Sequence, residues 1–154
     1  MCRNIFRVRE YDSWVIVMDR ISIQQIDSYD AQIPQLYESV GWSAYIRDLE
    51  SLKQGVLNSL CVMGAYEEGK LVGLIRAVGD GVTIVFIQDI LVNPVYQRRG
   101  IGRVLIASLL AQYENVRQIH LLTDDTAQTV GFYKAVGFTT VEQIHAKAFT
   151  RLKY

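Results

Sequence analysis

The sequence predicts a mixed α/β protein of the α+β type, with about four helices flanking a central, mostly antiparallel sheet of six to seven strands. Turn signals that contain glycine, at residues 67–69 and 79–81, separate strand-like segments and indicate antiparallel hairpins. Residues 83–122 give a strand, a helix and a strand, and this order implies a locally parallel pair. Both kinds of connection in one chain predict a mixed sheet with helices on both faces.

The chain is expected to enter the sheet through one strand and then to form two helices. Residues 20–26 alternate apolar and polar side chains, as a half-buried strand does. Residues 28–40 begin with capping side chains and then place apolar residues at helical spacing as far as Gly41. Residues 45–60 repeat that spacing, which predicts a single second helix.

The rest of the chain alternates between strands and helices. The remaining strands share runs of apolar or β-branched residues between turn signals, and they are expected at residues 60–66, 70–78, 83–92, 118–122, 138–144 and 148–152. Helices are expected at residues 100–113 and 126–135, where apolar residues recur every three or four positions. Pro94 ends the third of these strands, and Gly137 suits the C-cap of the last helix.

Length and composition favour one cytoplasmic domain. We assign residues 1–19 to an N-terminal extension and residues 20–154 to the domain, and Met18 is an alternative start that would leave residues 1–17 outside the native protein. No apolar run approaches the ~20 residues of a membrane span. Cys2 and Cys61 fit no metal-binding spacing, so we expect free thiols and no metal. Sixteen basic residues balance sixteen acidic ones, which argues against a nucleic-acid partner.

The most informative segment is residues 97–102, Gln-Arg-Arg-Gly-Ile-Gly, between a buried strand and an apolar helix. Two glycines at a helix mouth let the backbone approach a ligand, and the unpaired N–H groups there suit a phosphate. A dinucleotide fingerprint would need a third glycine, and a P-loop would need Gly-Lys-Ser/Thr; both are absent. The remaining match is Gln/Arg-x-x-Gly-x-Gly/Ala after a long strand.

This segment resembles the pyrophosphate-binding loop of the Gcn5-related N-acetyltransferases, the GNAT family. Two other segments also resemble the family: Leu-Val-x-Pro at residues 91–94, and Phe-Tyr-Lys-Ala-Val-Gly-Phe at residues 132–138. The order of elements fits from about residue 20 to the end. The resemblance implies the acyl-CoA N-acyltransferase fold of a small, single-domain, bacterial-type member, with acetyl-CoA as the acyl donor.

The resemblance also implies where acetyl-CoA binds. Backbone amides of the loop would hold the pyrophosphate, and the main chain at the end of the preceding strand would lie beside the pantetheine arm. The implied cofactor-binding residues are Leu91, Val92, Gln97, Arg98, Arg99, Gly100, Ile101, Gly102 and Arg103. The side chains of Arg98 and Arg99 could add charge-assisted contacts to phosphate or could remain solvated.

Two catalytic residues are implied. Tyr133 stands where many family members have a tyrosine that protonates the departing thiolate, although a packed aromatic is the alternative. Asp89 is the candidate base, because Gln88 replaces the first carboxylate of the Glu-Asp pair in the similar diamine acetyltransferases. The alternative for Asp89 is a carboxylate hydrogen-bonded within the sheet. Neighbouring strand residues face opposite sides, so Gln88 and Asp89 could share a cleft only across a bulge.

The acceptor amine is expected to meet residues of the helical region and of the following hairpins. The candidates are Trp42, Tyr45, Arg76 and Asp80. Trp42 and Tyr45 are expected in a loop, where they either line a pocket or pack the helices. Arg76 is expected to be an exposed hairpin residue, with binding of an acceptor carboxylate as the alternative.

The resulting functional hypothesis is direct acetyl transfer from acetyl-CoA to a primary amine of a small molecule or peptide in a ternary complex. Rival hypotheses are a different donor such as succinyl-CoA, and a non-catalytic acyl-CoA sensor or partner-binding module. Zero net charge disfavours a toxin that acetylates charged transfer RNA. We expect no membrane partner, and pairing of the closing strands between subunits leaves a homodimer open.

Overall fold

The computed structural model describes residues 6–10, 13–18 and 20–153. Contacts divide the chain into two compact units, residues 1–122 and residues 123–154, and each unit is described by itself. Within the described residues, no helix has the length and apolar character that crossing a bilayer requires.

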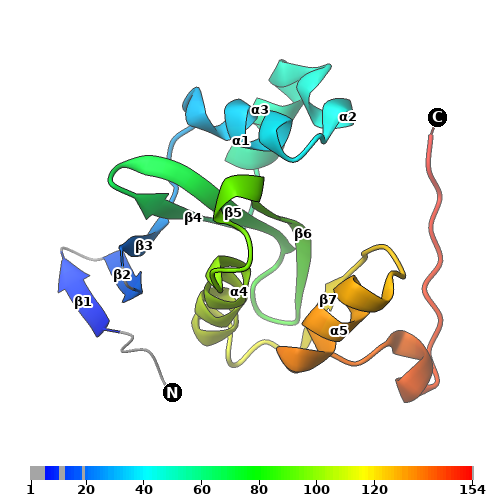
Figure 1. The fold of residues 1–154 in the computed structure, drawn as a ribbon. Helices are drawn as coiled ribbons and strands as arrows, with labels where there is room; N and C mark the ends of the chain where they lie inside the picture. Colours follow the sequence, from blue (N-terminus) through cyan, green and yellow to red (C-terminus); the bar gives the residue numbers. More distant parts are fainter. Residues whose placement is uncertain (1–5, 11–12, 19, 154) are drawn as a thin grey trace. The chain divides into compact units, whose positions relative to one another are not determined.

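The first unit is built on one sheet with the strand order β1-β2-β3-β4-β5-β6-β7 (Figure 1). Its described strands are β1 (Phe6–Glu10), β2 (Ser13–Met18), β3 (Ile21–Gln25), β4 (Cys61–Glu67), β5 (Lys70–Gly79), β6 (Ile84–Val92) and β7 (Gln118–Leu121). Neighbouring strands are antiparallel from β1 to β6, and only β6 and β7 are parallel. The predicted mixed, mostly antiparallel sheet is therefore confirmed.

Helices cover both faces of this sheet, as Figure 1 shows. They are α1 (Gln32–Ser39), α2 (Ser43–Ile46), α3 (Leu49–Leu57) and α4 (Ile101–Gln112), and the 3-10 helix η1 (Pro94–Tyr96) precedes α4. A Cβ atom at Gly73 of β5 would lie 3.1 Å from Ile101 and 3.3 Å from Leu105, so α4 packs directly on the sheet backbone. Glycine at this position permits the close approach.

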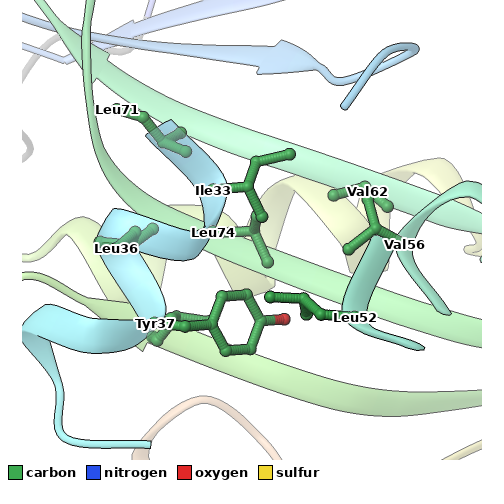
Figure 2. Packing of buried hydrophobic residues seen from close by; sticks show 9 residues of the cluster. Ile33, Leu36, Tyr37, Leu52, Val56, Val62, Leu71 and Leu74 are labelled. Carbon is green, nitrogen blue, oxygen red and sulfur yellow. The ribbon is translucent and has the colours of Figure 1, made fainter. Parts of the chain in front are cut away.

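The opposite face of the sheet packs against α1 and α3. Its core is one cluster of buried residues, shown in Figure 2: Ile33, Leu36, Tyr37, Leu52, Val56, Val62, Leu71, Leu74 and Leu91. Helical spacing puts the α1 residues of the cluster on one side of that helix, and burial of such apolar surface is the main stabilising term. This packing holds α1 against β5 and β6.

The prediction of one continuous helix over residues 45–60 is wrong. The chain forms α2 and α3 instead, because Asp48 interrupts the helix and caps the second part. Asp48 Oδ1 accepts from Ser51 N at 3.0 Å, and its Oδ2 accepts from Ser51 Oγ at 2.6 Å. Aspartate is a preferred N-cap because its side chain satisfies an unpaired helix N–H, and apolar periodicity does not reveal that preference.

The second unit contains α5 (Ala127–Ala135) and the 3-10 helix η2 (Val141–Ile144). Residues 138–144 and 148–152 were predicted as strands, and this prediction is wrong: η2 replaces the first, and the second has no ladder partner in the described part of the chain. A capping box between Thr140 and Gln143 favours the helical turn. Two strands that the sequence did not predict, β1 and β2, occur within residues 1–19, the segment assigned to an N-terminal extension, and β2 pairs with β3.

Candidate active site

A β-bulge in β6 shapes the site. Asp89 pairs with Arg76 of β5, whereas the next pair is Ile87 with Ala77, so Gln88 is the extra residue. A bulge breaks the strict alternation of side chains along a strand. As a result, Asp89 Oδ1 and Gln88 Nε2 both reach the Tyr45 hydroxyl, at 2.7 and 3.3 Å. From the sequence, Gln88 and Asp89 could share a cleft only across a bulge, and the structure has a bulge at this position.

The same bulge marks the end of the pairing between β6 and β7. The last parallel pair is Ile87 with Leu121, while the pairing of β6 with β5 continues to Val92. From residue 88 to residue 92, β6 therefore has a strand neighbour on only one side within the described residues. Main-chain groups on a strand edge of this kind can bind an extended ligand.

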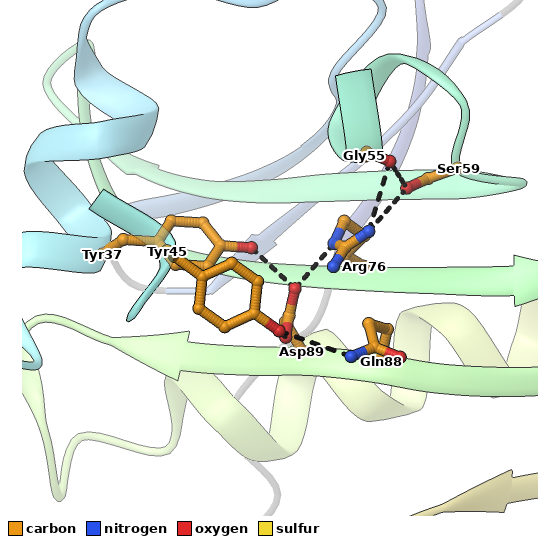
Figure 3. Close-up of polar contacts among 7 residues, drawn as sticks. All are labelled: Tyr37, Tyr45, Gly55, Ser59, Arg76, Gln88 and Asp89. Atoms are coloured by element: carbon orange, nitrogen blue, oxygen red, sulfur yellow. Dashed lines mark hydrogen bonds and ion pairs between the residues drawn. The ribbon is translucent and has the colours of Figure 1, made fainter. Parts of the chain in front are cut away.

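Asp89 lies at the centre of a buried polar network, drawn in Figure 3. The residue is only 2% exposed, and its Oδ2 accepts from Tyr37 Oη at 2.8 Å and from Arg76 Nε at 2.6 Å. Its Oδ1 accepts from Tyr45 Oη at 2.7 Å. With both oxygens occupied, the carboxylate holds two phenols and a guanidinium in fixed positions.

The expectation that Arg76 is exposed is wrong, because the residue is only 7% exposed. Its charge is paired with Asp89, and its Nη1 donates to Gly55 O at 3.2 Å and to Ser59 Oγ at 3.4 Å. These partners make burial of a guanidinium tolerable. Figure 3 shows how these bonds tie Arg76 to Asp89 on one side and to Gly55 and Ser59 on the other.

Burial and the Asp89 carboxylate raise the pKa of Tyr37 far above its usual value of 10.0. Burial also raises the pKa of Tyr45, and the hydrogen bond to Asp89 acts in the same direction. Both phenols therefore remain protonated at neutral pH and serve as donors to the carboxylate.

A cavity of about 160 Å³ opens beside this network. It is lined by Ala44, Tyr45, Asp48, Ser51, Leu52, Gly55 and Arg76. Trp42 stacks on Tyr45 with ring centroids 5.8 Å apart, and Tyr37 lies 5.0 Å from Tyr45. Tyr45 belongs to α2 rather than to a loop, so it both packs the helices and lines the cavity.

Asp80 lies apart from the cavity lining and closes its own turn through bonds from Val82 N and Thr83 N.

The glycine loop leads from β6 into α4. Arg98 and Gly100 have positive φ angles of 65° and 86°, and Gly100 is the N-cap of α4 without a side-chain cap. The first helical bond in this turn joins Val104 N to Gly100 O at 3.1 Å, which leaves the N–H groups of residues 101–103 without helical acceptors. Gln97 Nε2 donates to Val92 O at 2.9 Å and fixes the loop to the strand end.

The two loop arginines differ in their surroundings. Arg99 Nη2 donates to Glu67 Oε1 at 2.9 Å, and its guanidinium lies 5.3 Å from the centre of the Tyr96 ring. Arg98 is exposed and forms no ion pair with the described residues, and the same holds for Arg103 on α4. Ile101 and Leu91 are core residues, so only their backbone can serve a ligand.

In the second unit, Tyr133 lies in α5 between two aromatic rings. The centroids of Phe132 and Phe138 are 5.2 and 5.9 Å from that of Tyr133, both edge-on. Burial raises the pKa of Tyr133 above 10.0, and the nearby Asp124 carboxylate adds to the effect. The hydroxyl is therefore protonated at neutral pH, as a proton donor must be.

Sequence reasoning missed the role of Tyr37, which it treated only as a core position of a helix. A signal for the network did exist, since Arg76 is a charged residue inside an apolar run of a central strand. Such a residue needs a buried partner of opposite charge. Among the residues that the structure describes, no cluster of His, Cys, Asp and Glu could hold a metal ion.

Comparison with known proteins identifies the family. The model of the acetyltransferase (GNAT) family matches residues 26–138. A GNAT-family acetyltransferase from Streptococcus pneumoniae is 34% identical, with a TM-score of 0.78 over 86% of this chain and 98% of that one. An uncharacterized N-acetyltransferase, ycf52, from Gracilaria tenuistipitata var. liui is 35% identical over 70% of this chain and 60% of its own length.

A third comparison concerns the fold alone. The structure of AAC(6')-Iy in complex with the bisubstrate analogue CoA-S-monomethyl-acetylneamine has a TM-score of 0.60 at 22% identity, over 88% of this chain and all of that one. The chain spans about three fifths of the length of the first curated relatives that it matches. The expected fold class and the expected acyltransferase family are both confirmed, and the chain belongs to the acetyltransferase (GNAT) family.

Proposed function

We propose that this chain transfers an acetyl group from acetyl-CoA to a primary amine of a small molecule or peptide, by direct attack in a ternary complex. The observation that carries the proposal is the continuity of two features along the chain. The one-sided edge of β6, residues 88–92, leads directly into the glycine loop at the start of α4. A strand edge and a helix N-terminus in this order suit a long ligand that ends in phosphates.

The loop residues fit a pyrophosphate. Gly100, at φ 86°, has no Cβ atom to hinder the approach of an anion, and the N–H groups of Ile101, Gly102 and Arg103 lie at the positive end of the α4 dipole. Arg98 adds an exposed charge from the loop, whereas Arg99 supports the loop through Glu67. The main chain at Leu91 and Val92 would receive the pantetheine arm.

Acetyl-CoA supplies an activated acyl carbon, and the residues of this chain position the amine and move protons. The amine nitrogen bonds to the thioester carbon, the C–S bond breaks, and the sulfur takes a proton from Tyr133 Oη. Backbone N–H groups of β6 would polarise the carbonyl oxygen. The complex with a CoA-containing bisubstrate analogue that is known for AAC(6')-Iy supports direct transfer by this fold.

Asp89 is proposed as the proton acceptor, and it acts through Tyr45. Both oxygens of Asp89 are already hydrogen-bonded, but Oδ1 receives its bond from the hydroxyl of Tyr45, a residue that lines the cavity. The nitrogen that has attacked passes its excess proton to Tyr45 Oη while Tyr45 passes its own proton to Asp89.

We also propose a cytoplasmic location for the protein. A free, buried thiol such as that of Cys61 is compatible with a reducing compartment.

Calorimetry with CoA tests the loop. The substitution Gly100→Glu places a bulky anion where the pyrophosphate would bind, and we expect CoA affinity to fall at least tenfold. Gly41→Glu is the matched control, because Gly41 also has a positive φ, 75°, and has open space around its Cβ position. Equal CoA affinity in the Gly100 variant and the wild type would show that the loop is not the pyrophosphate site.

A further inference from the structure

The hydroxyl of Tyr45 has an unused hydrogen-bonding position. A phenol hydroxyl has one donor and two acceptor positions. In Tyr45 the donor serves Asp89 Oδ1 at 2.7 Å, and one acceptor position receives Gln88 Nε2 at 3.3 Å. The second acceptor position remains on the hydroxyl of Tyr45, a half-buried residue that lines the cavity of about 160 Å³. The site thus offers an oriented acceptor whose own proton is held by a carboxylate.

The charges around the cavity sum to a negative value. Asp48 and Arg76 both line the cavity, and Asp89 lies directly behind Arg76 and Tyr45. The Asp89 carboxylate neutralises the Arg76 guanidinium at 2.6 Å, so Asp48 is the uncompensated charge. Its carboxylate stays ionised, because hydrogen bonds from Ser51 lower its pKa. A cationic group is therefore attracted to the cavity, and an anionic group is not.

We propose that this cavity binds the acceptor, that Tyr45 Oη receives an N–H of its reacting amine, and that the acceptor is a primary amine without a neighbouring carboxylate. The inference rests on the acetyl-transfer function proposed above and names its substrate class. The bulge places Tyr45 against Gln88, where the one-sided edge of β6 begins. An amine bound to Tyr45 is thus held beside the strand edge that would receive the acyl arm.

The volume of the cavity suits a small apolar group of the acceptor. A cavity of roughly 150 Å³ accommodates benzene in an engineered protein, so about 160 Å³ holds one ring or a short alkyl chain. Leu52 and Ala44 provide apolar lining, while Ser51 and Asp48 provide polar lining. The proposed acceptor is therefore a small primary amine with an apolar body. The amino acid that carries the same side chain and an additional carboxylate is expected to be a poorer acceptor.

Matched pairs of acceptors test the inference. Purified protein is given acetyl-CoA and phenethylamine or phenylalanine, tyramine or tyrosine, isoamylamine or leucine, and cadaverine or lysine, and thiol release is followed. We expect each amine to have a kcat/KM at least tenfold above that of its amino acid. A preference for the amino acids would overturn the proposal, because Arg76 would then be binding their carboxylate.

Two tyrosine variants separate binding from structure. Tyr45→Phe removes the hydroxyl and keeps the ring, and we expect kcat/KM for the amine to fall at least tenfold while the KM for acetyl-CoA stays constant. Tyr66→Phe is the control, since it removes a phenol hydroxyl from a residue that packs against the same core cluster, does not line the cavity and does not bond to Asp89. It should leave kcat/KM for the amine within about threefold. Equal effects of the two variants on the amine would refute the role of Tyr45.

The charge of Asp48 is tested separately. Asp48→Asn keeps a good N-cap for α3 and removes the negative charge, so the fold should be retained. We expect the KM for the amine to rise several-fold and the preference over the amino acid to narrow. Unchanged selectivity would contradict the charge argument. If the wild type binds acetyl-CoA but acetylates no amine, the acetyl-transfer function itself fails, and this inference fails with it.

Discussion

Arg76 Nε lies 2.6 Å from Asp89 Oδ2, and the two side chains are 8% and 1% exposed. This ion pair joins β5 to β6 at the bulge and connects both strands to α3 through Gly55. Buried charges of this kind depend on each other, since either one alone would lack compensation. The pair therefore fixes the position of the carboxylate that holds Tyr45.

Removal of one partner should destabilise the protein strongly. We expect Arg76→Met to lower the free energy of unfolding by about 3–5 kcal/mol, because it leaves Asp89 buried and uncompensated. The double variant Arg76→Met/Asp89→Leu should be less destabilised than the sum of its single variants. Urea unfolding followed by circular dichroism measures both values, and simple additivity would show that the pair contributes no coupling.

The two loop arginines should contribute unequally to CoA binding. Arg98→Ala should weaken CoA binding about tenfold, because a charge-assisted bond to phosphate is lost. Arg99→Ala should change CoA affinity less than about threefold, because Arg99 is already bound to Glu67. Glu67→Gln is the control, since it releases Arg99 without removing its charge. Calorimetry that finds the larger loss for Arg99→Ala would reverse these roles.

The turn closed by Asp80 should be sensitive to acid. The Thr83 hydroxyl and the backbone N–H groups of Ile84, Val82 and Thr83 lower the pKa of Asp80. A depressed pKa means that the stabilisation is complete above the ordinary value of 3.8 and disappears as the pH falls through the lowered value. The Tm difference between wild type and Asp80→Asn should thus be largest near neutral pH and should narrow below about pH 4. A difference that is constant with pH would contradict this origin.

The thiol of Cys61 should be unreactive in the folded protein. Burial raises its pKa to about 11, so almost no thiolate is present at pH 8. We expect iodoacetamide to leave the Cys61 peptide unmodified in the native protein and to modify it fully in urea, as mass spectrometry can measure. Rapid modification of the native protein would contradict the burial of this thiol.

Much of the fold could be predicted because local patterns and the fold agree in the middle of the chain. The hairpin between β4 and β5, the long strand β6 and the helix α4 each have a turn residue or a periodicity that matches the structure. The break at Asp48 was missed because a capping bond competes with apolar spacing. The prediction of the two closing strands was wrong because runs of apolar or β-branched residues show strand propensity, while a strand also needs a partner edge.

The site was predictable where a motif fixes the backbone and less so where distant side chains meet. Gly100 and its loop follow from the sequence, since their role depends on conformation and on the helix that follows. The contact of Tyr37 with Asp89 joins residues 52 positions apart, and no local pattern carries that information. The bulge at Gln88 likewise depends on the register between β5 and β6.

The most direct test is the release of free thiol from acetyl-CoA by the purified protein across a panel of primary amines, in parallel with calorimetric binding of CoA. We predict release with at least one amine. We also predict that Tyr133→Phe lowers turnover at least tenfold while CoA binding is retained, because only the proton donor is lost. Failure of the wild-type protein to bind CoA, together with no thiol release for any amine, would contradict the proposed acetyl transfer.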